Sequence, residues 1–474
     1  MVIISVLVTL FIEKKEYTLI SASTGQIMVG AVAGLIFRYS VLSIDSVQGV
    51  DPSLFQTLFL PIIIFEAGWN SIETRWIFMH NLGTISIYAI LGTIVTSGII
   101  GLILFGFRAL SFDIIPLSVL DVIVFSALLA STDPVATMSI FGQLRAHPLL
   151  NTLVFGESIL NDAVAIILYK TFVEFYGEPL VWTSEFILTV IGKFLLNTFG
   201  SLGIGIALAL IASKVTQKVD MFPVIELILV LLCAMLSYLL TDFLELSGVT
   251  AIFFFGLVSK HYLWFNLTKQ SREFTDTFFR TLKDIAEITI FTLLGVQLFM
   301  FDWKYYNWPM IGVSLFACLF SRLYIIPFSI ILNCFRKKPQ NKITNKMQLI
   351  MWWAGVRGAV AYALAVGIKS YQESLHFDNS TDYIGGAEME ETAYEEMVTT
   401  THTVVIITIL ILGTSTGPVL KSMKLAGDHV KGVRDNLKKD LLQAKAHSKW
   451  TKFDSRWLIP FFSKLEGREK KLDK

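Results

Sequence analysis

Carboxylates inside apolar runs are the residues of this sequence best placed to do chemistry. One run contains Phe155-Gly-Glu-Ser-Ile-Leu-Asn-Asp-Ala-Val, so Glu157 and Asp162 lie well inside it. In a helix Ser158 and Asp162 share one face, because they are four residues apart, and Glu157 and Asn161 share an adjacent face. An ionisable group at membrane depth is costly and marks a functional site by default. A carboxylate beside a hydroxyl offers hard oxygen ligands, which suit a small cation.

A third carboxylate stands where a helix should break, in Ala130-Ser-Thr-Asp-Pro-Val. Proline removes a backbone donor and pushes the preceding Asp133 away from helical geometry. A second interruption is expected in Ala354-Gly-Val-Arg-Gly-Ala, where glycines flank Arg357. Matching interruptions in two halves of a chain indicate the ion site of an inverted-repeat transporter, since broken helices free carbonyls for coordination.

Two carboxylates on one membrane helix require a basic partner. Arg322 and Arg357 are the arginines well inside later apolar runs. Pairing Glu157 with either of them would leave Asp162 to titrate. Burial favours a protonated carboxyl and a bound cation favours the charged form. A carboxylate that holds a proton or a cation, never both, predicts obligatory exchange, and a single one suggests electroneutral one-for-one exchange. Glu287 is a further acid deep in an apolar run.

The elements that must position these groups are membrane helices. Of the 474 residues 54% are apolar and 16% are charged, against about 25% charged in soluble proteins. Each span needs about 20 apolar residues. This pattern predicts an all-α integral membrane protein with about thirteen spans, near 1–12, 19–38, 53–70, 82–107, 120–142, 150–173, 185–213, 221–241, 246–261, 281–300, 308–335, 346–369 and 398–420. The predicted interruptions fall in the fifth and twelfth spans.

Charge asymmetry predicts the orientation, because cytosolic loops of membrane proteins collect Lys and Arg. With the C-terminus in the cytosol, the basic loops fall on the cytosolic side, and the acidic segment 371–397 falls outside. Asn379 of that segment begins an Asn-Ser-Thr sequon and is a glycosylation candidate. Residues 1–425 are predicted to be the transmembrane domain and 426–474 a short basic cytosolic tail. The tail is either solvated or rests on anionic lipid.

Other classes of function find less support. The net charge of +1 gives no indication of nucleic-acid binding, and three cysteines without paired spacing indicate no metal site or disulfide framework. No cofactor is expected beyond the transported monovalent cation and protons. A cation channel remains an alternative, although no repeated filter sequence occurs. A membrane-embedded enzyme is another, but the sequence contains no Gly-x-Ser-x-Gly, His-Glu-x-x-His or P-loop pattern.

These motifs together resemble the sodium/proton exchangers of the monovalent cation/proton antiporter family. The segments that carry the resemblance are Thr132-Asp-Pro-Val-Ala, Phe155-Gly-Glu-Ser-Ile-Leu-Asn-Asp-Ala-Val and Gly355-Val-Arg-Gly-Ala. Leu58-Phe-Leu-Pro-Ile-Ile-Ile-Phe-Glu resembles the family's third-span motif but has one proline where the family has two, and Trp457-Leu-Ile-Pro-Phe-Phe in the tail resembles the endomembrane (Golgi and endosomal) animal-type members. The similarity covers about residues 17–425.

The resemblance implies two inverted repeats with crossing interrupted helices, a dimerisation domain beside an ion-carrying core, elevator-type alternating access, a homodimer, and a Golgi or endosomal membrane. It implies that Asp162 exchanges the proton and that Glu157 pairs with Arg322. The other implied roles are cation binding at Asn161, Ser158, Asp133 and Thr132, stabilisation of the second crossing helix by Arg357, a core acid at Glu287, and an inhibitor region at Phe59, Leu60 and Pro61.

Overall fold

The computed structural model describes residues 1–14, 21–39, 55–70, 75–111, 114–133, 135–176, 183–218, 222–336, 342–378, 391–427 and 453–464. Every regular element in these ranges is helical, which confirms the all-α class. By length and composition, seven helices within the described ranges can cross a membrane, and four shorter apolar helices accompany them. The chain is therefore a multi-pass membrane protein, while the predicted total of thirteen spans stays a prediction.

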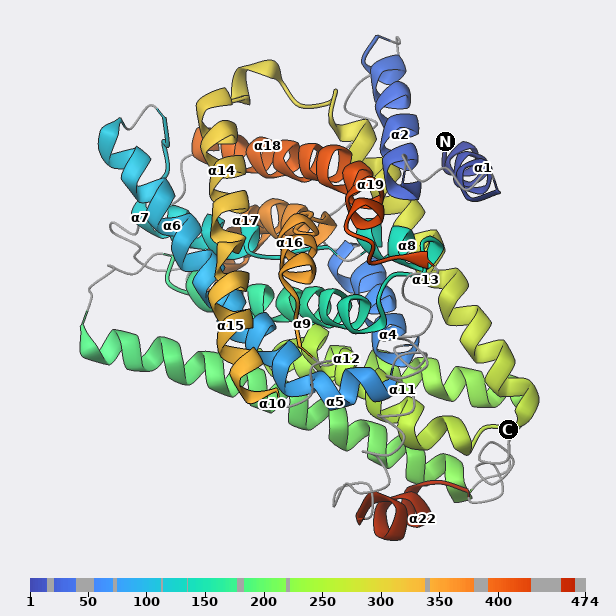
Figure 1. The fold of residues 1–474 in the computed structure, drawn as a ribbon. Helices are drawn as coiled ribbons and strands as arrows, with labels where there is room; N and C mark the ends of the chain where they lie inside the picture. The colour runs from blue at the N-terminus through green and yellow to red at the C-terminus, as the bar shows by residue number, and fades with distance from the viewer. Residues whose placement is uncertain are drawn as a thin grey trace. The chain divides into compact units, whose positions relative to one another are not determined.

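The described residues form two compact units, each built from separate stretches of the chain. Figure 1 shows the helices coloured along the chain. Unit 1 comprises 1–56, 81–190 and 287–433, and unit 2 comprises 57–80, 191–286 and 434–474. Both units draw on the predicted transmembrane domain, so this division is not visible in the linear sequence. Three helices pass from one unit into the other along the chain: α5 (Arg75–Ser86), α10 (Ser184–Lys218) and α13 (Lys269–Gln297).

Unit 1 holds most of the helices. They are α1 (Val2–Lys14), α2 (Ala22–Tyr39), η3 (Ile87–Leu91), α6 (Gly92–Leu110), α7 (Val119–Leu129), α8 (Val135–Gln143), α9 (Pro148–Val173), η5 (Trp303–Tyr305), α14 (Trp308–Ser321), η6 (Arg322–Tyr324), α15 (Ile325–Phe335), α16 (Asn345–Trp353), α17 (Ala359–Asp378), α18 (Glu391–Thr408), η8 (Ile409–Gly413) and α19 (Thr414–Ser422). The central helix is α9, which contacts α7, α16 and α17 and is buried along almost its whole length. Figure 1 shows α16 beside α9.

Both predicted interruptions are present in unit 1. The fifth predicted span is divided into α7 and α8, and residues 130–133 between them are not helical. Pro134 lies outside the described residues. The twelfth is divided into α16 and α17 by the non-helical stretch 354–358. A capping box of Ser118 and Asp121 begins α7, and the Thr344 side chain accepts from Met347 N at the start of α16. The first half of each broken span therefore has its own start signal.

Close backbone packing joins α2 to the end of α13 within unit 1. Gly30 and Gly34 lie one turn apart, and a Cβ on either would collide with the backbone carbonyl oxygen of Thr292 or Val296. Small residues at this spacing let membrane helices approach closely, where packing rather than hydrophobic burial drives association. The packing fixes the C-terminal part of α13 in unit 1.

Unit 2 contains most of η2 (Phe55–Phe59), α4 (Leu60–Asn70), most of α10, α11 (Pro223–Phe243), α12 (Gly248–Tyr262), η4 (Leu263–Phe265), the first part of α13, η10 (Asp454–Leu458) and α22 (Ile459–Phe462). The helix α13 begins twelve residues before the predicted span near 281, because its first half is amphipathic and rich in charged residues. Glu226 caps that start by accepting from Thr268 N at 2.9 Å. An apolar-run search finds only the second half of such a helix.

Candidate ion-binding site

The two helix interruptions meet each other. The backbone N–H of Asp133 donates to the carbonyl oxygen of Val356 at 2.9 Å, which joins the α7–α8 break to the α16–α17 break. Gly358 packs against Asp133 so closely that a Cβ there would collide with the Asp133 side chain. Glycine is therefore required at 358 by space, in addition to any role in weakening the helix.

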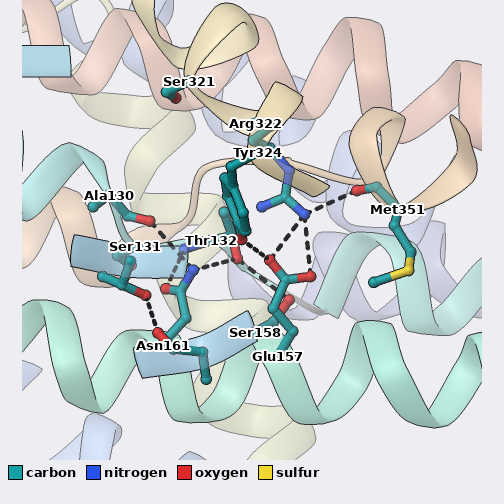
Figure 2. A network of polar contacts seen from close by, with 12 residues as sticks. Ala130, Ser131, Thr132, Glu157, Ser158, Asn161, Ser321, Arg322, Tyr324 and Met351 are labelled. Carbon is teal, nitrogen blue, oxygen red and sulfur yellow. Dashed lines mark hydrogen bonds and ion pairs between the residues drawn. The ribbon is translucent and has the colours of Figure 1, made fainter. Parts of the chain in front are cut away.

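The polar face of α9 lies against the first of these breaks (Figure 2). Ser131 Oγ donates to Asp162 Oδ1 at 2.7 Å. Asn161 Oδ1 accepts from Thr132 N at 3.0 Å, and its Nδ2 donates to the Ala130 carbonyl at 3.3 Å and to Thr132 Oγ1 at 3.1 Å. The Asn161 amide thus satisfies backbone groups that the broken helix leaves without helical partners, as buried polar groups require.

Ser158 completes the contact between α9 and the break. Thr132 Oγ1 lies 3.4 Å from Ser158 Oγ, and Ser158, Thr132 and Asp162 are all buried. Asp133, the next residue along the break, is partly exposed. Carboxylate and hydroxyl oxygens from two elements thus converge at one place. Such hard oxygen ligands are what Na⁺ and K⁺ take in proteins, by the same logic that governs Mg²⁺ and Ca²⁺.

Glu157 faces a different group of residues from Asp162. Its Oε1 lies 3.0 Å from Arg322 Nη2, and it also accepts from the Tyr324 hydroxyl at 3.0 Å (Figure 2). Arg322 Nη2 donates further to the Met351 carbonyl at 2.8 Å. Glu157 is fully buried and Arg322 nearly so, so the charges compensate each other in a low-dielectric setting. Asp162, in contrast, accepts from a neutral hydroxyl.

Gly355 makes room for this ion pair. A Cβ at 355 would collide with the Cδ and Nε atoms of Arg322. The second interruption thus supplies the space in which the guanidinium crosses toward Glu157. Each glycine of this segment thus packs against a charged residue. Gly355 lies against Arg322, and Gly358 lies against Asp133.

Arg357 lies at the C-terminal end of α7. Its Nη1 donates to the carbonyl oxygens of Leu129 and, at 3.1 Å, of Ser131, and its Nη2 donates to the Cys318 carbonyl at 3.3 Å. Cations are favourable at the C-terminus of a helix, where unpaired carbonyls carry partial negative charge. The side chain of Arg357 therefore stabilises the end of the first broken helix, although its backbone belongs to the second.

The predicted site residues divide into those that the structure brings together and those that it does not. Asp162, Asn161, Ser158, Thr132 and Asp133 gather at the first break, with Glu157, Arg322 and Arg357 adjoining. Glu287 lies on α13 and is partly exposed, and Phe59, Leu60 and Pro61 lie at the η2–α4 junction of unit 2. Asn379 falls outside the described residues.

Two site residues were missed from the sequence. Ser131 lies beside Thr132 in the predicted break, and that position is the signal that could have identified it. Tyr324 stands two residues after Arg322, and a tyrosine deep in an apolar run is a polar group that needs a partner. The hydrogen bond from the Tyr324 hydroxyl to Glu157 can be inferred only once Arg322 is known to pair with Glu157.

His147 precedes the first turn of α9 and lies outside the membrane span. Its imidazole is buried, and burial lowers the pKa of His147 from 6.5 to about 4. Between these values the unfolded chain binds a proton and the folded chain does not, so stability is lost as pH falls through this window. We expect acidification from about pH 7 to about pH 4 to cost up to about 3 kcal/mol at this residue.

Thermal unfolding of the detergent-purified protein measures this effect. His147→Gln removes the titrating group, so the variant's unfolding temperature should fall less steeply with acidification than that of the unaltered chain. Parallel curves for the two proteins would show that His147 is not held neutral in the folded state.

The chain is similar to known sodium/hydrogen exchangers over most of its length. Residues 2–422 match the transmembrane sodium/hydrogen exchanger family. Sodium/hydrogen exchanger 1 of Dictyostelium discoideum is 31% identical over 97% of this chain and 65% of its own length. Sodium/hydrogen exchanger 8 of Homo sapiens is 33% identical over 91% of this chain and 70% of its own. The chain thus spans about two thirds of these curated relatives.

A solved structure shares the fold. The sodium proton antiporter MjNhaP1 of Methanocaldococcus jannaschii at pH 8 superposes with a TM-score of 0.66 at 20% identity, covering 89% of this chain and 96% of that one. The family match spans the motifs at both helix breaks and the Glu157–Asp162 helix. This chain therefore belongs to the sodium/hydrogen exchanger family of secondary transporters.

Proposed function

We propose that this chain exchanges a monovalent cation, Na⁺ or K⁺, for protons across a membrane, with Asp162 as the carboxylate that the two ions share. The observation that carries the proposal is the position of Asp162, buried on α9 and hydrogen-bonded to Ser131 at the end of a broken helix. A carboxylate in this place can accept a proton or help to coordinate a cation. Because it does not hold both, the two flows are coupled.

The remaining ligands follow from the neighbouring oxygens. In the state described, the Asn161 amide and the hydroxyls of Ser158 and Thr132 hydrogen-bond one another or the backbone. A cation would exchange some of these bonds for coordination, with Asp133 adding a second carboxylate. The Glu157–Arg322 pair would hold α9 in place without taking part in exchange, and Glu287 would be a further core acid.

One exchangeable carboxylate supports electroneutral one-for-one exchange. Protonated Asp162 and cation-bound Asp162 carry the same net charge, so a cycle that returns each form moves no net charge. The division into two compact units supports alternating access of the elevator type, in which one body moves against another. We further propose that the protein is a homodimer in a Golgi or endosomal membrane, where it regulates lumenal and cytosolic pH. Its basic tail would contact anionic lipid. An inhibitor would bind at Phe59–Pro61, and Asn379 would carry a glycan.

Proton flux in proteoliposomes tests the proposal. The purified chain is reconstituted into vesicles that enclose a pH-sensitive dye. Gradients of Na⁺, K⁺ or Li⁺ are then imposed with and without a voltage clamp. We expect at least one cation to drive proton movement at a rate that the clamp leaves unchanged. Flux that changes with voltage would overturn the one-for-one stoichiometry. Cation current in the absence of an opposing proton gradient would identify a channel instead.

A further inference from the structure

The tail segment 453–464 is fixed to unit 2 by a buried carboxylate. Asp454 Oδ1 accepts from the Tyr262 hydroxyl at 2.7 Å, and Asp454 Oδ2 lies 2.8 Å from His261 Nε2. Asp454 is buried, and Tyr262 is the last residue of α12. A buried carboxylate that receives two polar side chains is a specific contact, because leaving it without partners would be costly. The segment is therefore held at the end of a membrane helix.

Asn266 binds the far end of the same segment through its backbone. Its Nδ2 donates to the Phe462 carbonyl at 2.8 Å, and its Oδ1 accepts from Lys464 N at 2.7 Å. Ser463 Oγ donates to the Tyr262 carbonyl at 3.0 Å. With Asp454 at one end and Asn266 at the other, the orientation of the helical turns between them is determined. One side of the segment must face unit 2 and another must face away.

The side that faces away is aromatic. Phe453, Trp457 and Phe461 are 50%, 62% and 56% exposed, respectively. They recur every fourth residue, so in a helical segment they share one face. We call this the aromatic face. Three large aromatic side chains in one row are costly in water, since each leaves apolar surface hydrated.

The aromatic face continues an exposed apolar surface on a candidate membrane span. Ile211 and Val215 on the last turns of α10 are 59% and 43% exposed, and α10 is one of the candidate membrane spans. Lys214, between them, donates to the Phe461 carbonyl at 2.6 Å and lies 3.7 Å from the Phe461 ring centroid. The aromatic face thus starts where the exposed apolar surface of α10 ends. This is the level at which aromatic belts and long basic side chains meet the headgroups.

We propose that residues 453–464 form an interfacial anchor, whose aromatic face inserts among the headgroups and upper acyl chains of the bilayer. Unit 2 supplies the orientation through Asp454 and Asn266, and the lipid covers Phe453, Trp457 and Phe461. The contact differs from electrostatic attraction of a basic tail to anionic lipid, because burial of aromatic surface needs no lipid charge. It is also independent of which cation the protein carries.

Site-specific quenching tests the anchor in the full-length chain. Cys233, Cys318 and Cys334 are replaced by alanine, and a single cysteine is labelled with an environment-sensitive fluorophore, either in Trp457→Cys or in Ser455→Cys. Ser455 is exposed but lies off the aromatic face, so it is the matched control. Each protein is reconstituted in phosphatidylcholine vesicles that carry a spin label on a shallow acyl carbon.

Quenching at position 457 should exceed quenching at 455 by about two-fold or more in neutral vesicles, and high salt should leave it unchanged. Adding Asp454→Ala should bring the signal at 457 down toward that at 455. Equal quenching at both positions, or none at either, would overturn the anchor and leave the face to water or a soluble partner. Quenching at 457 that requires phosphatidylserine and disappears in high salt would show charge attraction alone. Quenching at 457 that survives Asp454→Ala unchanged would overturn the role of unit 2 in orienting the face.

Discussion

Asp162→Asn is expected to abolish cation-driven proton flux while leaving the protein inserted and folded. Asparagine keeps an oxygen that can accept the Ser131 hydroxyl, now 2.7 Å from Asp162 Oδ1, so the local packing survives. An amide does not titrate and carries no charge to balance a bound cation. We expect the flux to fall by at least about 100-fold, to the background of protein-free vesicles. Loss of the charged carboxylate ligand weakens cation binding by several kcal/mol.

The measurement is the initial rate of vesicle pH change after a cation jump, normalised to the amount of reconstituted protein. Asp121→Asn is the matched control, because Asp121 is another buried carboxylate of unit 1 whose contacts are the capping bonds of α7 and the Tyr176 hydroxyl. This control should retain flux even if it unfolds at a lower temperature. Exchange at the normal rate in Asp162→Asn would refute the assignment of Asp162 as the shared carboxylate.

The second large effect is expected on stability. Glu157→Gln and Arg322→Gln each leave one buried charge without its partner, and breaking a buried ion pair in this way costs about 3–5 kcal/mol. The double variant removes both charges, so its loss should be clearly smaller than the sum of the two single losses. Tyr324→Phe removes one hydrogen bond to Glu157 and should cost only about 1 kcal/mol.

Thermal unfolding of the four variants in detergent provides the comparison, with size-exclusion chromatography as a check of the folded state. Glutamine is chosen at position 322 because Gly355 packs against the Arg322 side chain. A bulkier replacement would collide with the backbone at Gly355. Strict additivity of the two single losses would show that Glu157 and Arg322 do not stabilise each other. It would also remove the reason for separating the structural role of Glu157 from the exchange role of Asp162.

Local sequence chemistry predicted the parts of the site that are close in the chain. The spacing of Ser158 and Asp162 placed them on one helix face, and the Thr-Asp-Pro and Gly-Val-Arg-Gly segments predicted both helix breaks. Each of these inferences needs only the geometry of a few consecutive residues. Residue type alone also marked Glu157 as an acid that needed a basic partner.

The choice of partners could not be derived in the same way. Residue type left Arg322 and Arg357 as equal candidates for Glu157, and only the resemblance to a family favoured Arg322. In the structure Arg322 reaches the carboxylate, while Arg357 binds carbonyls at the end of α7. Contacts between segments more than a hundred residues apart depend on how helices pack, which no local pattern encodes. The two compact units and the docking of Asp454 on α12 were invisible for the same reason.

The hydrogen bond from Asp133 N to the Val356 carbonyl couples the two helix breaks, so that they move together. The Arg357 side chain reinforces the joint by binding the Ser131 carbonyl from the opposite half of the chain. A bound ion that shifts one break by a fraction of an ångström must therefore displace the other, since close-packed interiors transmit strain rather than absorb it. Under the proposed exchange mechanism, binding of an ion beside Asp162 would in this way reach all four half-helices at once.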